Sequence, residues 1–172
     1  MEINCKEAAA FLREAEDVLI LCHRNPDGDT LGSGCGLCHA LKNMGKRARI
    51  LVNDPIPRKF RYLTEGCEDT FEPKTIVSTD IADEQLFGEK LTPYLGKVEL
   101  AIDHHPSNTR FAKRLFLEPD SAATTELIYG LVKELGTPLT PEIADCLYTG
   151  LTTDTGCFVY SNTTPRSHRI AA

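Results

Sequence analysis

Short, continuous apolar runs alternate along this chain with longer stretches in which apolar residues recur at helical spacing. Residues 18–21 (Val-Leu-Ile-Leu) form the first run, and residues 48–52, 75–79 and 98–102 form three more. Runs of this length without polar alternation are typical of strands buried on both faces of a parallel sheet. The pattern therefore predicts four strands, with a shorter fifth over residues 115–117.

The stretches between these runs carry helix signals. Asn4 followed by Glu7 is a capping-box pattern, which predicts a first helix with Ala8, Phe11 and Leu12 on one face. Further helices are predicted over residues 31–44, 121–135 and 141–151, and a last short strand over residues 158–160. Alternation of this kind predicts an α/β fold, with a mainly parallel sheet sandwiched by helices.

Length and composition narrow the class of protein. A chain of 172 residues with 41% hydrophobic and 26% charged residues suits one compact domain. We expect a cytoplasmic protein, because no run of ~18 apolar residues exists and the first eleven residues carry three charges. The seven cysteines are an odd number and several lie in apolar patterns, so reduced thiols are expected. A net charge of -6 argues against binding long duplex DNA.

Acidic and imidazole side chains follow three of the predicted strands. They are His23, Asp27 and Asp29 after the first strand, Asp80 after the third, and Asp103, His104 and His105 after the fourth. In open α/β sheets, ligands bind beyond the carboxyl ends of the strands. The sequence therefore predicts that independent segments deliver metal ligands to one edge of the sheet.

Each segment alone has a simpler interpretation. Asp27-Gly28-Asp29 by itself is more typical of a surface turn, and Asp154-Thr155-Gly156 is as typical of a turn as of a site. The His104-His105 pair is harder to explain by solvation or core packing. The helix expected near Leu31 is also predicted to offer free N–H groups to a phosphate oxygen.

At these residues the chain resembles the DHH phosphoesterase family, and within it the bacterial oligoribonucleases that also act as 3'-phosphoadenosine-5'-phosphate (pAp) phosphatases. The resemblance lies in the stretch from His23 to Ser33, in Asn53 to Phe60, in Asp103-His104-His105, and in Gly150 to Pro165. These motifs follow one another in the family's order and cover nearly the whole chain. Residues 1–172 are thus expected to form the DHH catalytic domain, ending before the family's smaller C-terminal domain, which grips the substrate.

The resemblance implies the roles of individual residues. One metal would be held by His23, Asp27 and Asp80, and another by Asp29, Asp80, His104 and Asp154. His105 would face the substrate phosphate, and Asp103 would orient a histidine. Manganese is the family's usual ion, with magnesium as the alternative, and the hypothesis is two-metal hydrolysis of a phosphate ester. The implied substrates are short oligoribonucleotides, cyclic-dinucleotide breakdown products or pAp, and family members often pair through this domain, so a homodimer is considered.

Other readings remain open at this point. Cys35-Gly36-Leu37-Cys38-His39 matches the c-type haem attachment pattern, but haem attachment requires export and this pattern lies inside a predicted helix. The related manganese-dependent inorganic pyrophosphatases share the metal ligands, although Gly28 and the Asn162-Thr163-Thr164-Pro165 ending favour the oligonucleotide branch. A third reading is a metal-binding remnant with little activity without the second domain. Leu86, where the family usually has Arg, puts one local ion pair in doubt.

Overall fold

The computed structural model describes residues 1–172 and is built around one five-stranded parallel sheet. The strands are β1 (Val18–Cys22), β2 (Ala48–Val52), β3 (Thr75–Thr79), β4 (Leu100–Asp103) and β5 (Arg114–Leu117). Their order across the sheet is β2-β1-β3-β4-β5, and every neighbouring pair is parallel. Strand β2 lies on one side of β1 and strand β3 on the other, so the direction of the chain across the sheet reverses. A topological switch point therefore lies between β1 and β3.

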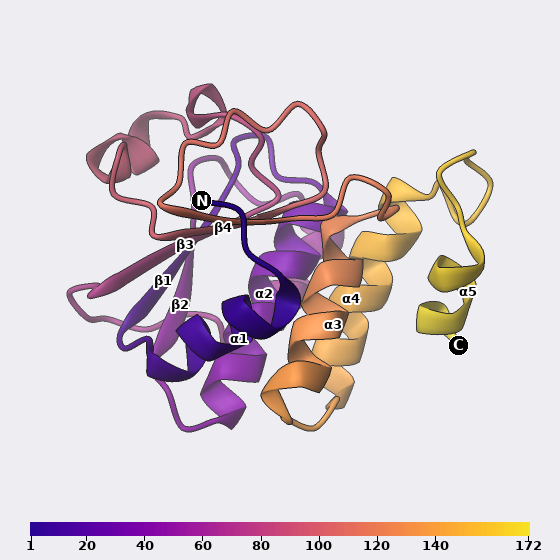
Figure 1. Cartoon of the computed structure of the whole chain (residues 1–172), viewed down its shortest axis with the longest axis horizontal. Coiled ribbons are helices and arrows are strands. Elements are labelled where there is room, and N and C mark those ends of the chain that lie inside the picture. The colour runs from indigo at the N-terminus through magenta and orange to yellow at the C-terminus, as the bar shows by residue number, and fades with distance from the viewer.

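The α-helices all lie on one side of this sheet (Figure 1). They are α1 (Cys5–Glu14), α2 (Gly28–Asn43), α3 (Thr124–Leu135), α4 (Pro141–Asp154) and α5 (Pro165–Ala171). The opposite side is covered by the short 3-10 helices η2 (Glu84–Leu86) and η3 (Glu89–Tyr94) and their loops, while η1 (Arg58–Thr64) packs against α2. The expected sandwich is therefore asymmetric, because only one of its outer layers consists of α-helices.

Side-chain alternation along β1 shows how the two faces are filled. Val18 and Ile20 belong to a core cluster of 28 residues shared with the α-helices, whereas Leu19 and Leu21 belong to a cluster of 10 under η2 and η3. All five residues of the strand are fully buried. The continuous apolar run in the sequence thus reflects burial on both faces, as predicted.

Helices α2 and α4 approach each other closely through glycine. A Cβ atom added to Gly32 would lie 2.4 Å from the carbonyl oxygen of Cys146, which no real side chain tolerates. At Gly150, it would lie 2.3 Å from the Cγ2 of Thr125 and 2.8 Å from an oxygen of Asp29. The missing side chains therefore let the end of α4 reach the start of α2, where the candidate ligands lie.

The structure corrects several boundaries and one element type. The α2 helix starts at Gly28 rather than near residue 31, α3 at Thr124 rather than 121, and β4 at Leu100 rather than 98. The short α5 helix was not predicted. The strand predicted over residues 158–160 is wrong, because Gly156, Cys157 and Phe158 have φ of 56°, 56° and 67°, in the left-handed region that no strand uses.

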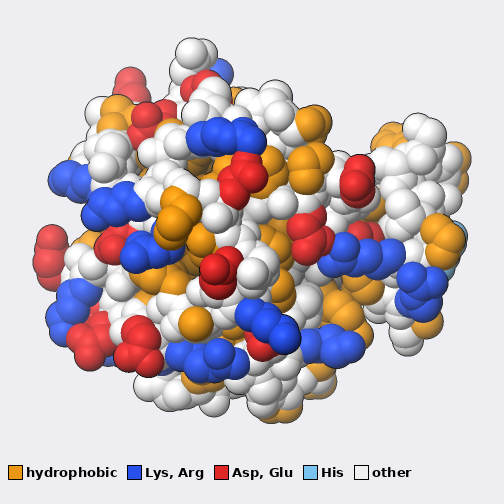
Figure 2. Space-filling view, viewed as in Figure 1, with side chains coloured by type: hydrophobic (Ala, Val, Ile, Leu, Met, Phe, Trp, Pro, Cys, Tyr) orange, Lys and Arg blue, Asp and Glu red, His pale blue; other side chains and the backbone are white.

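Lysine and arginine are intermixed with aspartate and glutamate on the face shown in Figure 2, without a continuous region of either sign. None of the helices has both the length and the apolar character needed to cross a bilayer. All seven cysteines are free, and Cys35 and Cys38 of the haem-like pattern are fully buried in α2.

Candidate metal centre

Side chains that follow β1, β3 and β4 converge with side chains from α2 and α4 at the carboxyl ends of the strands, over the switch point between β1 and β3. The Nε2 atom of His23 lies 3.5 Å from Oδ2 of Asp80 and 3.6 Å from Oδ2 of Asp27. These three residues form one of three groups whose ligand atoms are close enough to share an ion. Residues separated by up to 57 positions in the sequence are thus brought together here.

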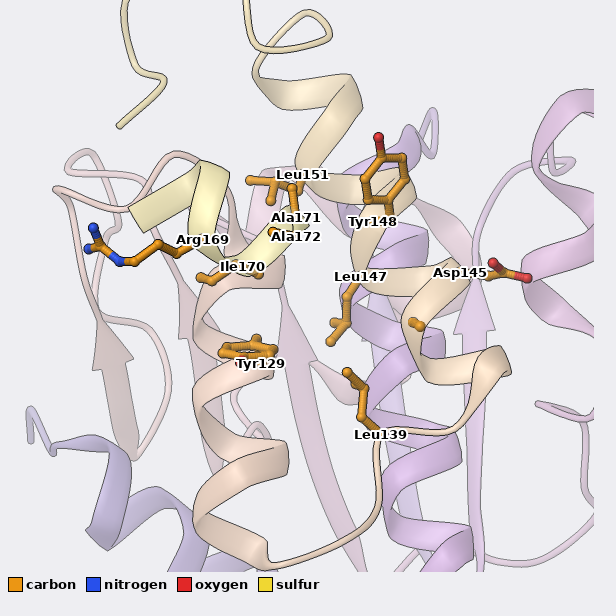
Figure 3. A pocket seen from close by; sticks show the side chains of 11 residues that line it. Tyr129, Leu139, Asp145, Leu147, Tyr148, Leu151, Arg169, Ile170, Ala171 and Ala172 are labelled. Carbon is orange, nitrogen blue, oxygen red and sulfur yellow. The ribbon is translucent and has the colours of Figure 1, made fainter. Parts of the chain in front are cut away.

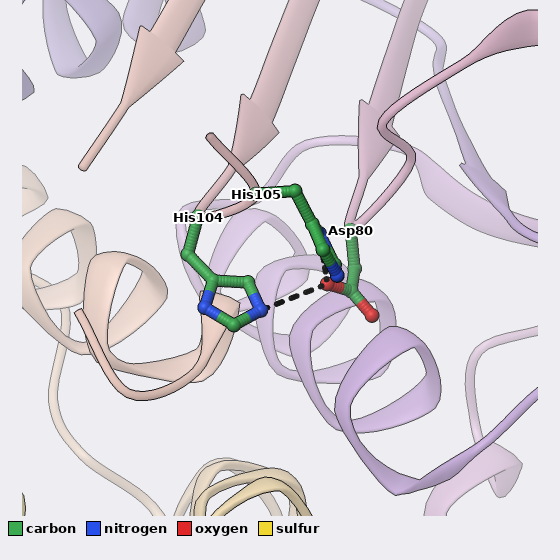
Figure 4. A group of neighbouring side chains, drawn as sticks. All are labelled: Asp80, His104 and His105. Carbon is green, nitrogen blue, oxygen red and sulfur yellow. Dashed lines mark ion pairs between the residues drawn. The ribbon is translucent and has the colours of Figure 1, made fainter. Parts of the chain in front are cut away.

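His104 faces three further carboxylates. Its Nε2 atom lies 3.4 Å from Asp154, 3.8 Å from Asp80 and 4.0 Å from Asp29. The same atom is buried and has no hydrogen-bond partner. Figure 4 shows His104 and His105 directed toward the carboxylate of Asp80 from adjacent positions at the end of β4.

These distances fit ligands around a cation better than they fit hydrogen bonds. A hydrogen bond from nitrogen to oxygen spans about 2.7–3.2 Å, and the contacts of His23 and His104 to the carboxylates are all longer. Ligand atoms that each lie about 2.0–2.2 Å from one ion are separated from one another by about 3.0–3.5 Å or more. A buried imidazole nitrogen without a partner, facing three carboxylates, is therefore suited to a divalent metal.

Asp80 supplies a separate oxygen to each of these two histidines. Its Oδ2 atom faces His23, while its Oδ1 atom faces His104 and accepts a hydrogen bond of 2.9 Å from the hydroxyl of Thr124. The residue follows β3 directly and has a left-handed backbone with φ of 61°. Non-glycine residues in this region store strain, which in proteins is concentrated at functional sites.

Asp103 contacts His105 and holds it in place. Its Oδ1 atom accepts hydrogen bonds from Nδ1 of His105 at 2.8 Å and from the backbone N–H of His104 at 2.9 Å. Its Oδ2 atom accepts one from Nδ2 of Asn108 at 2.7 Å. Asp103 is fully buried, whereas the His105 side chain is 42% exposed, so the free Nε2 edge of His105 can meet a ligand from solvent.

Comparison with known proteins agrees with this arrangement of motifs. A family model for the N-terminal domain of the DHH family matches residues 17–151. The chain belongs to the DHH family. It is 41% identical over 162 residues to the bifunctional oligoribonuclease and PAP phosphatase NrnA of Thermus thermophilus, covering 90% of this chain and 48% of that protein. The protein of the same name from Bacillus subtilis is 30% identical over 162 residues, covering 91% of this chain and 51% of the relative.

A solved structure supports the same fold. An exopolyphosphatase-related protein from Bacteroides fragilis superimposes with a TM-score of 0.86 at 23% identity, covering 96% of this chain and 54% of that one. At this identity the match shows the fold alone. The chain spans about half the length of the relatives it matches, so the alignment relates this DHH domain to only part of each of them.

The DHH domain positions Asp29 by a contact that the sequence did not predict. The backbone N–H groups of Thr124 and Thr125, at the start of α3, donate to the two carboxylate oxygens of Asp29 at 2.6 and 3.0 Å. Ala123, the N-cap residue of α3, has no side chain able to do this. The only sign of this contact in the sequence is that α3 begins without a capping side chain of its own. Local patterns could not identify Asp29 as the residue that caps it.

A second network, also missed from the sequence, orients His104. Its Nδ1 atom lies 3.0 Å from the carbonyl oxygen of Ser121 and donates to it in the tautomer that leaves Nε2 facing the carboxylates. The guanidinium group of Arg166 on α5 donates to Glu118 at 2.7 Å and to the hydroxyl of Ser121 at 3.3 Å. The last helix of the chain is thus tied to the loop that holds His104.

Asp27 has a structural as well as a candidate chemical role. It is the N-cap of α2, and its Oδ1 atom accepts hydrogen bonds of 3.0 Å from the backbone N–H groups of Asp29 and Thr30. The expectation that the start of this helix offers these N–H groups to a phosphate is therefore wrong. The other oxygen of Asp27 faces His23, as described above.

The carboxylates and imidazoles of the candidate centre strongly shift one another's pKa values. Burial lowers the pKa of His23, but the carboxylates of Asp27 and Asp80 outweigh it and raise the pKa to about 10. Burial also lowers the pKa of His104, but the carboxylates of Asp154 and Asp29 outweigh it and raise the pKa to about 10. Burial and the charges of Asp80 and Asp154 raise the pKa of Asp29. Such a crowded acidic site calls for positive charge.

A separate apolar cavity of about 530 Å³ lies between α3, α4 and α5, and Figure 3 shows its lining. Its walls include Tyr129, Leu139, Leu147, Tyr148, Leu151 and Ile170. None of the candidate ligands lines it. Hydrolytic chemistry requires the polar groups at the strand ends, so we assign the candidate site there.

Proposed function

We propose that residues 1–172 form the catalytic domain of a phosphoesterase that uses two divalent metal ions to hydrolyse short oligoribonucleotides, cyclic-dinucleotide breakdown products or pAp. The observation that carries this proposal is the buried, unpartnered Nε2 atom of His104 facing Asp29, Asp80 and Asp154. The substrate class is taken from the relatives, which are named as oligoribonucleases and PAP phosphatases.

Two ion positions are proposed because Asp80 presents different oxygens to two groups. His23, Asp27 and Asp80 would hold one ion, and Asp29, Asp80, His104 and Asp154 the other. The four carboxylates balance the charge of two dications, which offsets the repulsion that helps to raise the pKa of Asp29. Mixed carboxylate and imidazole ligation suits manganese, and magnesium is the alternative.

The chain's own residues would then position the substrate phosphate. When bound, the ions supply Lewis-acid stabilisation of phosphoryl oxygens and lower the pKa of attacking water. His105 is the group placed to meet the phosphate, because Asp103 holds its Nδ1 atom and leaves its Nε2 atom free. In its protonated form His105 donates from Nε2 to a phosphoryl oxygen and stabilises the charge that builds up there. Asp103 acts as a positioning residue in this scheme.

The relatives are about twice as long as this chain, and we propose that their second half completes the grip on the substrate. Contacts to remote parts of a substrate are used to position the reacting group, so their loss lowers rate as well as affinity. The DHH domain by itself is therefore expected to turn over more slowly than a full-length relative.

The test is a manganese-dependent assay on a diribonucleotide, on pAp and on pyrophosphate. We expect hydrolysis of the first two substrates, loss of activity on chelation, and loss in Asp80→Ala with the fold retained. Preferential cleavage of pyrophosphate would favour the pyrophosphatase reading instead. Manganese binding without turnover of any substrate would identify a metal-binding remnant, and full turnover by Asp80→Ala would refute the site assignment.

A further inference from the structure

The loop that follows Asp154 has an unusual backbone. Gly156, Cys157 and Phe158 are three consecutive residues in the left-handed region, with φ of 56°, 56° and 67°. Glycine adopts this conformation freely, but Cys157 and Phe158 are strained in it. Strain of this kind persists only where the surrounding structure over-determines it, and it clusters at ligand sites.

Several contacts hold the strained loop against the candidate metal centre. The backbone N–H of Phe158 donates to the hydroxyl of Thr155 at 3.1 Å, and the Phe158 ring lies 5.3 Å from the ring of His168 on α5. The side-chain amide of Asn162 donates to the carbonyl oxygens of Asp154 and Ala122, both at 3.1 Å. The loop is therefore held in place on both sides of residues 159–161. Phe158 contacts Thr155 and α5, and Asn162 binds the backbone of Asp154 and of Ala122, next to the residue that orients His104.

This backbone directs two apolar side chains into solvent. Val159 is 80% exposed and Tyr160 is 61% exposed, although both lie within six residues of Asp154. The ring of Tyr160 lies against Gly156, where an added Cβ atom would come within 2.5 Å of a ring carbon. One face of the ring is thus covered by the backbone of Gly156, and the ring retains a large solvent-accessible area.

The position of this ring relative to the centre is constrained by the chain. Gly156 is two residues from Asp154, so their Cα atoms are separated by at most about 7.6 Å. Asn162, two residues beyond Tyr160, bonds directly to the backbone of Asp154. The ring of Tyr160, packed on Gly156, is therefore held close to the backbone that carries Asp154.

We propose that Tyr160, flanked by Val159, is a stacking platform for a nucleobase of the substrate. This inference rests on the proposed function, because it places the base relative to a phosphate at the metal centre. Tyrosine suits the role since its flat ring stacks on any base and has few rotatable bonds to restrict.

The experiment compares a ligand that carries a base with one that lacks it. Binding of adenosine 5'-monophosphate and of ribose 5-phosphate is measured by titration calorimetry in the presence of manganese, for the wild-type chain and for variants. We expect the wild type to bind the adenosine compound about tenfold more tightly, which is within the range measured for stacking of one base on an aromatic side chain. Tyr160→Ala and Tyr160→Leu should lose this preference, and Tyr160→Phe should keep it.

Two comparisons separate a stacking role from a structural one. Tyr160→Leu retains an apolar side chain over Gly156 but has no flat ring, so its ribose 5-phosphate affinity should stay at the wild-type value. Leu139→Ala removes an equally prominent apolar side chain, 51% exposed, just before the opposite end of α4 and should leave both affinities unchanged.

The outcomes distinguish this inference from the proposed function. Equal binding of the two ligands by the wild type, or an unchanged preference in Tyr160→Ala, would overturn the platform. Failure of the wild type to bind either ligand would also overturn the platform, because the base would then contribute nothing to binding. Hydrolysis of a diribonucleotide in the same preparation decides the proposed function separately. A preference lost in Tyr160→Leu, with hydrolysis present, supports both.

Discussion

Asp29 caps a helix that begins 95 residues further along the chain, because its carboxylate accepts the backbone N–H of Thr124 at 2.6 Å. The same carboxylate is a candidate metal ligand, fully buried beside Asp80 and Asp154. One side chain therefore connects the stability of α3 to the geometry of the centre. Asp27 caps its own helix α2 in a similar way, whereas Asp29 caps a helix that is distant in the sequence.

Asp29→Asn is expected to lower the free energy of unfolding even in chelator, by about 1–2 kcal/mol, because an amide replaces one of the two oxygens that accept N–H groups from α3. Asp154→Asn is the matched comparison, since the Asp154 carboxylate accepts no backbone N–H. Both variants should lose manganese affinity. Urea unfolding with and without manganese measures the difference, and identical midpoints for the two variants in chelator would contradict the capping role.

Gly150→Ala is expected to destabilise the domain by about 1–3 kcal/mol and to weaken manganese binding. The added methyl group would lie 2.3 Å from Thr125 and 2.8 Å from Asp29, so α3 and α4 must separate where both approach the centre. Gly130→Ala provides the control within α3, where the new methyl group meets only Cys5 at 3.6 Å. That substitution should stabilise the domain by about 0.5–1 kcal/mol through helix propensity. Thermal unfolding of both variants decides the point.

Arg166→Ala is expected to reduce manganese affinity although Arg166 touches none of the proposed ligands. Its guanidinium group fastens Glu118 and Ser121, and the carbonyl of Ser121 accepts the N–H that orients His104. Groups that orient metal ligands typically change affinity by about 10–100-fold, and this more remote residue should lie at the lower limit. Arg169→Ala, on the same helix without an ion pair, should bind manganese as the wild type does. An equal effect of the two substitutions would argue against the network.

Manganese is expected to stabilise the domain by mass action. At a concentration 100 times the dissociation constant, one bound ion contributes about 2.7 kcal/mol to the free energy of unfolding. The effect is expected because the cation compensates the repulsion among Asp29, Asp80 and Asp154. Calorimetric unfolding should show a manganese-dependent midpoint for the wild type and a much smaller shift for Asp80→Ala. A wild-type midpoint that does not respond to manganese would remove the basis of the centre.

Local patterns were sufficient for most of the secondary structure. The apolar run of β1, the capping box of Asn4 and Glu7, and the end of α3 at Leu135 each depend on residues close together in the chain. Each of these features was predicted correctly. The wrong prediction over residues 158–160 also came from a local pattern, because Phe-Val-Tyr has high strand propensity. The loop is instead held by contacts with more distant residues, between Phe158 and His168 and between Asn162 and Ala122.

The sequence was sufficient to predict the types of ligand residue and the edge of the sheet at which they lie. Several of them directly follow predicted strands, and parallel strands have their carboxyl ends at one edge. Their grouping depends on packing between distant segments. Glycine-mediated contact between α2 and α4 brings Asp154 beside Asp29, and the order β1-β3-β4 places Asp80 between His23 and His104. The cap on α3, the Arg166 network and the exposed ring of Tyr160 also arise only in the folded molecule. Each of them depends on contacts between residues of different segments, and neither hydrophobic periodicity nor a local motif reports such contacts.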